Sequence, residues 1–276
     1  MGKTKRRRGG RFLMLILILL GALIGWSAAD QRSIDVSRFT VSGAPEAFSG
    51  FKIAQISDLH NAEFGADNQK LVEILEREAP DAIVLTGDLV DGWRTNVDSA
   101  ASFARRCAAI ADCYFVTGNH EAKIGDAYGA LEAALSDAGV TVLRNASVRI
   151  RRGVESIRLI GVDDPSFGGG SNLDATLEAL SSVDFTILLA HRPERIDEYA
   201  KWRTDLVLSG HAHGGQIRIP GIGGMYAPGQ GFFPKYTSGE YTLGDTTMIV
   251  SRGLGNSVLP LRVNDRSEVV IVTLNK

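Results

Sequence analysis

The sequence predicts an α/β fold in which two β-sheets pack together and helices cover their outer faces. From Phe51 onward, short apolar runs alternate with segments of helical periodicity, and no internal repeat interrupts the alternation. The 276 residues are 44% hydrophobic and 22% charged, as in an ordinary globular protein. Disorder, collagen and a multi-pass membrane protein are excluded by this composition.

The first half of the domain alternates regularly between strands and helices. The apolar residues Leu71, Ile74 and Leu75 show the spacing of one helical face, whereas the strand candidates are short apolar runs. The predicted elements, in order, are strand Phe51–Ser57, helix Asn68–Glu78, strand Ala82–Thr86, helix Val97–Ile110, strand Tyr114–Thr117, helix Ala127–Ala138 and strand Val140–Leu143.

The second half continues this pattern and then becomes glycine-rich. Its predicted elements are strands Val148–Ile150 and Ile157–Val162, helix Leu173–Leu180, strand Phe185–Ala190, helix Glu194–Trp202, strand Leu206–Leu208 and β stretches Gln216–Ile219, Met248–Ser251 and Val269–Leu274. The stretch Met225–Tyr236 contains glycines and aromatic residues close after the last histidine. We expect it either to form a wall beside a site or to be a turn region that packs Phe232 and Phe233 inward.

Charge is distributed unevenly along the chain. Six of the 30 Lys and Arg residues lie in the first 11 positions, where no acidic residue occurs, so the rest of the chain carries 24 basic and 32 acidic residues. Because a nucleic-acid groove needs a basic stripe, no nucleic-acid partner is expected.

The N-terminal segment has the pattern of an export signal. The basic run is followed by an apolar stretch, Phe12 to Ile24, and by small residues up to Ala29. Residues 1–29 are therefore predicted to be one hydrophobic helix, either an uncleaved signal-anchor or a signal peptide cleaved near Ala29, and residues 30–50 a linker with the first edge strand. A single span in the cytoplasmic (inner) membrane would place residues 51–276 outside the cytoplasm by the positive-inside rule.

All five histidines follow directly on predicted strand ends, and most have other polar residues beside them. Loops at the carboxyl ends of strands are where α/β proteins place their sites. One such histidine would more often be structural, but five point to a common site. The segments are Ser57-Asp58-Leu59-His60, Gly87-Asp88, Gly118-Asn119-His120-Glu121, Ala190-His191 and Gly210-His211-Ala212-His213.

Read as motifs, these segments are D-x-H, G-D, G-N-H-E, a solitary His and G-H-x-H, in that order from Asp58 to His213. The series resembles the metallophosphoesterase (calcineurin-like phosphoesterase) superfamily, and its flanking residues look most like a bacterial branch with membrane-anchored members. The resemblance implies a calcineurin-like fold, a four-layer α/β/β/α sandwich of two mixed sheets, with residues 51–276 as the metallophosphoesterase catalytic domain.

The resemblance also implies a binuclear centre of two divalent metal ions, with Mn favoured over Fe, Zn or Co. One ion would be held by Asp58, His60, Asp88 and His213, and the other by Asp88, Asn119, His191 and His211. Imidazole and oxygen ligands without thiolates suit such a catalytic site. A bridging Asp88 fits metals about 3.5 to 4 Å apart, which lower the pKa of water enough to supply a nucleophile near neutral pH.

Three neighbouring residues are assigned lesser roles. In the family the histidine of G-N-H contacts the substrate, so His120 is expected to act as a general acid or to stabilise the transition state. Glu121 either orients a neighbouring ligand or complements a helix dipole. Arg192 either contacts a phosphate oxygen or is an ordinary surface arginine.

The expected activity is hydrolysis of a phosphodiester or pyrophosphate bond in a phosphorylated small-molecule, lipid or cell-envelope substrate. UDP-2,3-diacylglucosamine, a lipid A precursor, is the most specific substrate that the resemblance implies, but it is made in the cytoplasm, on the other side of the membrane from the predicted domain. The alternatives are a phosphomonoesterase or protein phosphatase on the same scaffold, since substrate preference lies outside the motifs, and a non-catalytic binding scaffold. A scaffold would be expected to lose ligands, and here none is missing.

Overall fold

The computed structural model describes residues 33–168, 177–178, 184–256 and 262–276, together with seven isolated positions before residue 33. Most of the predicted N-terminal helix and most of the predicted helix Leu173–Leu180 lie outside the described residues.

The first sheet has six strands in the order β1-β16-β2-β3-β4-β5. All neighbours pair in parallel except β16 and β2. The inner strand β3 is buried along its whole length, which fits its uninterrupted apolar sequence. The bounds are β1 Ile34–Val41, β2 Lys52–Ile56, β3 Ala82–Thr86, β4 Asp112–Val116, β5 Val140–Val142 and β16 Ser267–Leu274.

The second sheet also has six strands, in the order β14-β15-β9-β8-β7-β6. Its four inner strands are parallel, and the two edge strands run antiparallel to their neighbours. Both sheets are therefore mixed, as expected. The bounds are β6 Ala146–Arg152, β7 Glu155–Gly161, β8 Phe185–Leu189, β9 Leu206–Ser209, β14 Gly239–Leu243 and β15 Thr246–Val250.

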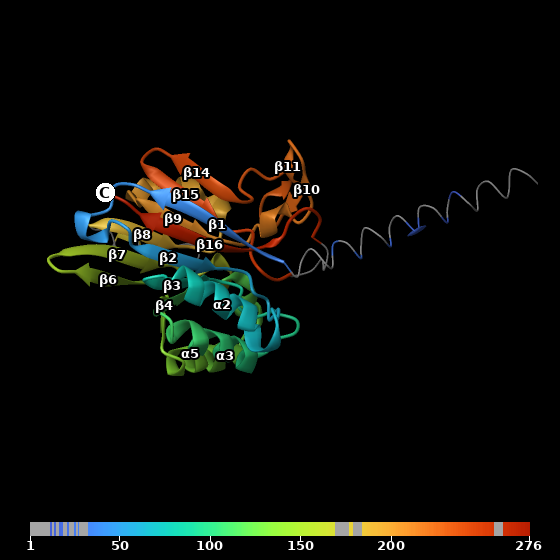
Figure 1. Cartoon of the computed structure of the whole chain (residues 1–276), viewed down its shortest axis with the longest axis horizontal. Helices are drawn as coiled ribbons and strands as arrows, with labels where there is room; N and C mark the ends of the chain where they lie inside the picture. Colours follow the sequence, from blue (N-terminus) through green and yellow to red (C-terminus); the bar gives the residue numbers. More distant parts are fainter. Residues whose placement is uncertain are drawn as a thin grey trace, which may run out of the picture.

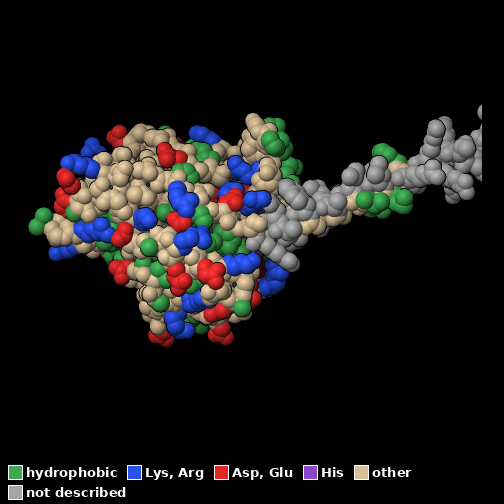
Figure 2. All heavy atoms as spheres, in the orientation of Figure 1, with side chains coloured by type: hydrophobic (Ala, Val, Ile, Leu, Met, Phe, Trp, Pro, Cys, Tyr) green, Lys and Arg blue, Asp and Glu red, His purple; other side chains and the backbone are tan. Residues whose placement is uncertain are grey.

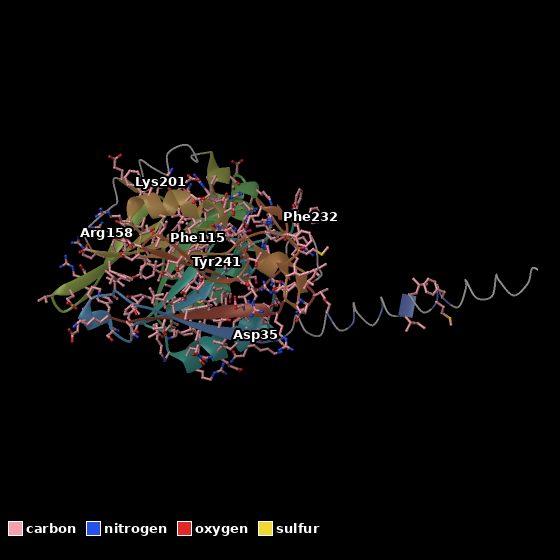
Figure 3. All side chains as sticks on the ribbon, turned by 90° about the horizontal axis from the view of Figure 1, so that it is seen from above. Asp35, Phe115, Arg158, Lys201, Phe232 and Tyr241 are labelled. Carbon is pink, nitrogen blue, oxygen red and sulfur yellow. The ribbon has the colours of Figure 1, made fainter. Side chains whose placement is uncertain are left out.

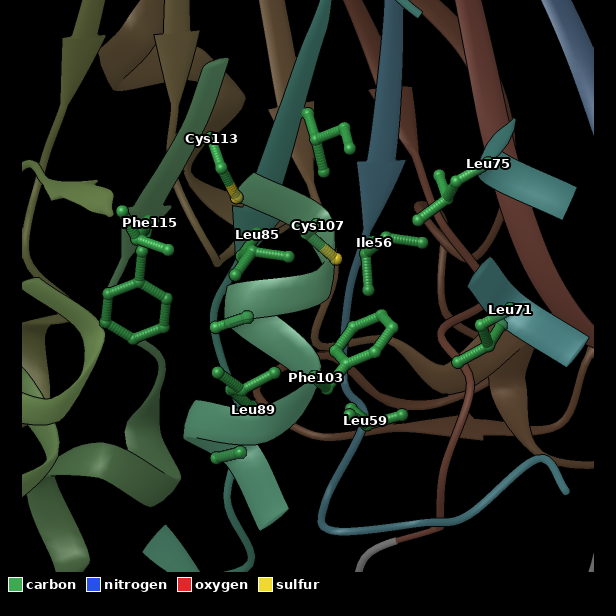
Figure 4. Packing of buried hydrophobic residues seen from close by; sticks show 14 of the residues in the cluster. Ile56, Leu59, Leu71, Leu75, Leu85, Leu89, Phe103, Cys107, Cys113 and Phe115 are labelled. Carbon is green, nitrogen blue, oxygen red and sulfur yellow. The ribbon is translucent and has the colours of Figure 1, made fainter. Parts of the chain in front are cut away.

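Helices α2 (Gln69–Glu78), α3 (Val97–Ala108) and α5 (Ala127–Asp137) lie against one face of the first sheet (Figure 1). Their apolar faces form one core with the strands, in which Leu71 and Leu75 of α2 lie opposite Phe103 and Cys107 of α3 (Figure 4). Because these side chains are almost entirely apolar, this core needs no buried polar partner.

A second core fills the space between the two sheets, where Val84 and Val116 of the first sheet belong to one cluster with Leu159 and Ile187 of the second. A third core covers the far face of the second sheet. There the predicted helix Glu194–Trp202 is replaced by three consecutive short helical turns, η5 (Pro193–Arg195), α7 (Ile196–Tyr199) and η6 (Ala200–Trp202). The order of layers is thus helices, sheet, sheet and helical turns.

The surface carries two features that bear on the site. Basic and acidic side chains are interspersed over the face shown in Figure 2, and apolar side chains gather near the hairpin of β10 (Arg218–Ile219) and β11 (Gly223–Gly224). The next hairpin, β12 (Tyr226–Ala227) and β13 (Gly231–Phe232), leaves Phe232 and Phe233 72% and 64% exposed. The alternative in which these two rings pack inward is therefore wrong, and Phe232 lies at the end of the molecule far from Lys201 (Figure 3).

Within the part of the chain that the structure describes, no helix is both long enough and apolar enough to cross a bilayer. This finding contradicts the location predicted from the N-terminal pattern, a single membrane span with an extracytoplasmic domain.

Candidate metal centre

The polar motifs meet at the carboxyl ends of strands from both sheets. Strands β2 and β3 end just before Asp58 and Asp88, β4 ends before Asn119, and β8 and β9 end before His191 and His211. Because the two sheets pack face to face, these ends lie along one edge of the sandwich. These segments therefore meet because each follows the carboxyl end of a strand, which is where α/β proteins place their sites.

Two motif glycines are required by close approach. A Cβ at Gly87, where φ is +88°, would lie 2.7 Å from His191 Nδ1, and a Cβ at Gly118 would lie 2.2 Å from Asp88 Oδ1. Both distances are shorter than any ordinary contact, so a side chain at either position would displace a residue of the site. Gly87 and Gly118 thus allow the loops that follow β3 and β4 to pack in close contact.

Five of the seven expected ligands adopt a left-handed backbone conformation that non-glycine residues rarely occupy. They are Asp58 (φ 52°), His60 (48°), Asp88 (52°), His211 (65°) and His213 (47°). Such conformations each cost of order 1 kcal/mol or more and persist where the surrounding structure enforces them, typically at functional sites.

One cluster contains Asp58, His60, Asp88 and His213, each of which offers a ligand atom within 4.8 Å of the others. The Nε2 atoms of His60 and His213 lie 3.3 Å apart. His60 Nε2 lies 3.5 Å from Asp88 Oδ2, and His213 Nε2 lies 3.5 Å from Asp58 Oδ1. All four residues are buried, so these nitrogens and oxygens converge on one small volume.

The second cluster contains Asp88, His191 and His211, again within 4.8 Å. His191 Nδ1 lies 2.7 Å from the carbonyl oxygen of Thr86, which can only accept, so Nδ1 carries the hydrogen and donates it. His191 Nε2 lies 3.3 Å from Asp88 Oδ2. Asp88 belongs to both clusters, which is the place of a bridging carboxylate.

The unpaired polar atoms of the site test whether metal ions fit it. Four buried atoms of the seven expected ligands have no hydrogen-bond partner among the described residues, namely His60 Nδ1, Asn119 Oδ1, His191 Nε2 and His211 Nε2. A buried polar atom left without a partner costs about 1–3 kcal/mol. Three of them belong to the set expected around the second ion, and their nitrogen and oxygen chemistry suits a divalent cation. The residues therefore fit a binuclear centre.

Burial sets the charge state of most ligands. It lowers the pKa of His60 and of His211 to about 3, so both rings are neutral at pH 7, and it raises the pKa of Asp58 to about 6. His191 behaves differently: burial acts to lower its pKa, but the carboxylates of Asp88 and Asp58 outweigh burial and raise it to about 10. The position facing His191 Nε2 thus attracts positive charge, which is a proton in the absence of metal.

Glu121 lies fully buried behind the ligands. Its carboxylate accepts hydrogen bonds from the backbone amides of Asp88 (2.8 Å), Leu89 (2.8 Å), Val90 (3.2 Å) and Gly118 (2.7 Å). Burial and the nearby Asp88 raise the pKa of Glu121 to about 7, against the lowering by these donors. Of its two expected roles, the contacts support the orienting one, since Glu121 ties together the loops that carry Asp88 and Asn119.

His120 lies at the start of α4 (Asn119–Lys123) and is held from two sides. Its backbone amide donates to Asp88 Oδ1 at 2.7 Å, and its Nδ1 accepts from the amide of Gly92 at 2.9 Å. The neutral ring therefore carries its hydrogen on Nε2. Burial lowers the pKa of His120 below its usual value, which favours this neutral form.

Arg192 is not an ordinary surface arginine, because only 21% of its side chain is exposed. Its Nε and Nη2 donate to the two carboxylate oxygens of the buried Asp164 at 2.7 and 3.1 Å. Arg192 lines a pocket of about 340 Å³ that also contacts Asn119 and His211. Pro228 and Gly229 form another wall, so the stretch Met225–Tyr236 does border the site.

Two residues of the site were not singled out from the sequence. Asp91 is buried within 4.8 Å of ligand atoms of His60 and His120, and only its place in Gly-Asp-Leu-Val-Asp-Gly could have signalled it. Arg262 is fully buried, and its Nη2 lies 3.3 Å from His213 Nδ1 and 2.6 Å from the carbonyl oxygen of Gly255. No local pattern links Arg262 to the site, because its contact with His213 spans 49 residues.

Comparison with known proteins gives consistent findings. Residues 51–215 match the family model of the calcineurin-like phosphoesterases. The chain is 32% identical to the uncharacterised metallophosphoesterase YkuE of Bacillus subtilis, over 89% of this chain and 87% of that protein. It is 30% identical to the phosphodiesterase YaeI of Escherichia coli, over 81% of this chain and 82% of that protein.

Among solved structures, the phosphopantetheinyl hydrolase PptH of Mycobacterium tuberculosis superposes with a TM-score of 0.51 at 15% sequence identity. The match covers 75% of this chain and 91% of that one. At this identity the likeness concerns the fold alone.

Proposed function

The chain belongs to the calcineurin-like phosphoesterase family and is a phosphate-ester hydrolase, and from this premise we propose that it hydrolyses phosphodiester bonds with two divalent metal ions. Imidazole, carboxylate and amide ligands without thiolates suit Mn²⁺, Fe²⁺, Zn²⁺ or Co²⁺, and of these we propose Mn²⁺. The observation that carries the proposal is the place of Asp88 in both ligand clusters, with buried atoms of Asn119, His191 and His211 that lack partners on the side of the second ion.

When bound, the two ions supply Lewis acidity at the phosphoryl oxygens and a nucleophile from water near neutral pH. Asp58, His60, Asp88 and His213 would hold one ion, and Asp88, Asn119, His191 and His211 the other. Glu121 keeps the loops of Asp88 and Gly118 together. The backbone amide of His211 donates a hydrogen bond to the Asp58 carboxylate at 3.1 Å, which fixes the orientation of that carboxylate.

We propose that His120 donates a hydrogen bond to the leaving oxygen of the substrate. Gly92 occupies Nδ1 as a donor, so the ring presents the hydrogen on Nε2 for donation. Its lowered pKa keeps the ring neutral at pH 7, and the hydrogen stabilises negative charge that develops on the departing oxygen. Lys123 on the same short helix adds positive charge beside this position and helps to lower the pKa of His120.

The pocket beside Asn119 and His211 favours diesters over monoesters. With about 340 Å³ it has room for a group attached to the phosphate beyond the scissile bond. The similarity to a protein named phosphodiesterase points the same way. UDP-2,3-diacylglucosamine remains the most specific substrate to test, since its scissile phosphate bears substituents on two sides.

The decisive experiment compares bis(p-nitrophenyl) phosphate with p-nitrophenyl phosphate as substrates of the full chain. The protein is stripped of metal, assayed, and assayed again with added Mn²⁺, Zn²⁺ or Co²⁺. We expect diester hydrolysis that depends on added metal and is fastest with Mn²⁺, and UDP-2,3-diacylglucosamine is then assayed under the same conditions. Turnover of the monoester alone would replace the proposal with a phosphomonoesterase, and no turnover of either compound by metal-loaded protein would contradict it.

A further inference from the structure

We propose that Arg192, Lys123 and Ser166 form a subsite for a second phosphate group of the substrate, beyond the phosphate that is cleaved. This inference rests on the proposed phosphodiesterase function and assigns a substrate class to it. The three side chains line the pocket that begins at Asn119 and His211, two residues expected to hold the second ion.

Arg192 is fixed with part of its guanidinium still available. Its Nε and Nη2 are engaged by Asp164, and Nη2 also donates to Ser166 Oγ at 3.1 Å. Nη1 lies 3.6 Å from Glu194 Oε1, beyond hydrogen-bond distance. The Asp164 carboxylate is fully buried and accepts from the amide of Ser166 at 2.8 Å, so the pair is held rigidly. A fixed guanidinium edge is the preferred protein group for binding phosphate oxygens.

Ser166 adds a second donor. Arginine has no acceptor, so Ser166 Oγ must accept from Arg192 Nη2, and the hydroxyl hydrogen points elsewhere. Ser166 is an exposed residue that lines the pocket. The hydroxyl hydrogen can therefore reach a ligand oxygen on the same side as the guanidinium.

Lys123, the last residue of α4, supplies a cation to the lining of the same pocket. A Cβ at Gly92 would lie 2.8 Å from Lys123 Cβ, so the stem of the lysine packs closely on that glycine. The same Cβ would lie 3.4 Å from His120 Nδ1, which places the stem beside the catalytic ring. From there the ammonium group reaches the pocket that Lys123 lines.

Pro228 and Gly229 form the remaining wall, which has no polar side chain of its own. Glu194 Oε1 lies close to this wall, 2.4 Å from a Cβ added at Gly229, and it forms an ion pair with Arg192 Nη1 at 3.6 Å without a hydrogen bond. With the exception of Asn119 and the ring of His211, the polar side chains that line the pocket are donors, which matches an oxygen-rich anion such as phosphate.

The experiment measures inhibition of bis(p-nitrophenyl) phosphate hydrolysis by three nucleotides at a fixed concentration of free Mn²⁺. AMP carries one phosphate, ADP carries a second phosphate joined to the first, and adenosine 3′,5′-bisphosphate carries a second phosphate across the sugar. We expect ADP or the bisphosphate to bind about tenfold more tightly than AMP, as for one hydrogen-bonded charged contact. The preferred nucleotide shows whether the two phosphates are joined directly or through a sugar. Equal inhibition constants for all three would overturn the proposal.

The variants Lys123→Gln and Arg192→Lys should each reduce the ratio of the AMP inhibition constant to that of the preferred nucleotide severalfold. Lys123 is exposed, so its substitution does not threaten the fold, and the lysine in Arg192→Lys keeps a positive charge against Asp164. Lys201→Gln, an exposed lysine that does not line the pocket, is the matched control and should keep the preference. A preference that survives in both pocket variants would contradict the assignment.

Calorimetric binding of the same nucleotides to the metal-loaded His120→Asn protein repeats the comparison without turnover. If bis(p-nitrophenyl) phosphate is not hydrolysed at all, the proposed function fails, and the ratio of dissociation constants still decides whether the subsite exists. Hydrolysis with equal dissociation constants would leave the function standing and reject the subsite.

Discussion

The core beneath the helices and the edge that carries the ligands are equally buried but chemically opposite. Phe103, Leu71 and Cys107 have no exposed surface, and neither does Asp58, while Asp88 is 1% exposed. The core gains free energy from removing apolar surface from water. At the edge, buried carboxylates and imidazoles cost free energy when they have no partner. The left-handed backbone conformations there cost free energy as well. The core beneath the helices therefore stabilises the fold. The edge that carries the ligands is held in place by that stability until cations bind its unpaired atoms.

The largest expected effect concerns the residue that the two clusters share. Asp88→Asn keeps the shape of the side chain but removes the charge that faces His60 and His191. Because metal ions supply several kcal/mol of transition-state stabilisation, kcat/KM on bis(p-nitrophenyl) phosphate should fall by about 10³-fold or more. Bound Mn²⁺ per chain, measured by elemental analysis, should fall with it. Asp112→Asn, an exposed carboxylate at the start of β4, is the control, and unchanged metal content in Asp88→Asn would refute the bridging role.

The second prediction separates proton donation from metal binding at the same edge. His120→Asn should lower kcat by about 10² to 10³-fold, the usual cost of removing a hydrogen-bond donor to a developing negative charge, while the metal content stays the same. The loss should be greater for an alkyl ester than for a nitrophenyl ester, because nitrophenolate leaves without a proton. An equal loss for both leaving groups would contradict the assignment of His120 to the leaving oxygen.

In the core, the effect should be on stability alone. Phe103→Ala removes a fully buried ring and should lower the free energy of unfolding by about 3–5 kcal/mol. Chemical unfolding monitored by circular dichroism measures this change. The folded variant should still bind its metal ions with the affinity of the parent chain. A parallel loss of metal affinity in the folded protein would mean that the two regions are not separate.

The smallest effect, about 1 kcal/mol per pH unit for each group, should appear in the pH dependence of the metal-free protein. His60 and His211 have pKa values lowered to about 3, whereas unfolded histidines titrate near 6.5. The unfolded state then binds more protons below pH 6.5, so stability falls as the pH is lowered. Asp58, Glu121 and Asp265, with pKa values raised to about 6, 7 and 6, oppose this between about pH 7 and 4, so the fall in stability should be clearest below about pH 4.

His191 affects the pH dependence of stability in the opposite direction. Its pKa is raised to about 10, so the folded protein keeps a proton that the unfolded chain loses above pH 6.5, and stability should also fall as the pH rises from about 7 to 9. Thermal unfolding at a series of pH values, with and without Mn²⁺, measures both limbs. The alkaline limb should disappear with Mn²⁺, since a cation replaces the proton, and a metal-free protein that grows more stable above pH 7 would contradict this account.

Much of the fold was predictable because its elements are marked locally. Strand β3 begins and ends at the predicted residues, and α2 and α5 differ from their predicted ranges by one residue at one end. Each is a long apolar run or a clear helical stripe. The short turns around α7 were predicted as one helix, and β14 was not predicted, because its alternating pattern is weak. Periodicity reports burial of a face, and it fails where an element is short or half exposed.

The sequence by itself determined which residue types stand at the strand ends and in what order, and hence that they gather at one edge. Only the tertiary structure decided which atoms face each other. The contact of His211 with Asp58 spans 153 residues, that of Arg262 with His213 spans 49, and that of Arg192 with Asp164 spans 28. The hydrogen positions on His120 and His191 likewise depend on Gly92 and Thr86 from another loop. The physical reason is that local periodicity fixes burial and direction, whereas hydrogen-bond partners and left-handed turns are set by packing between segments distant in the chain.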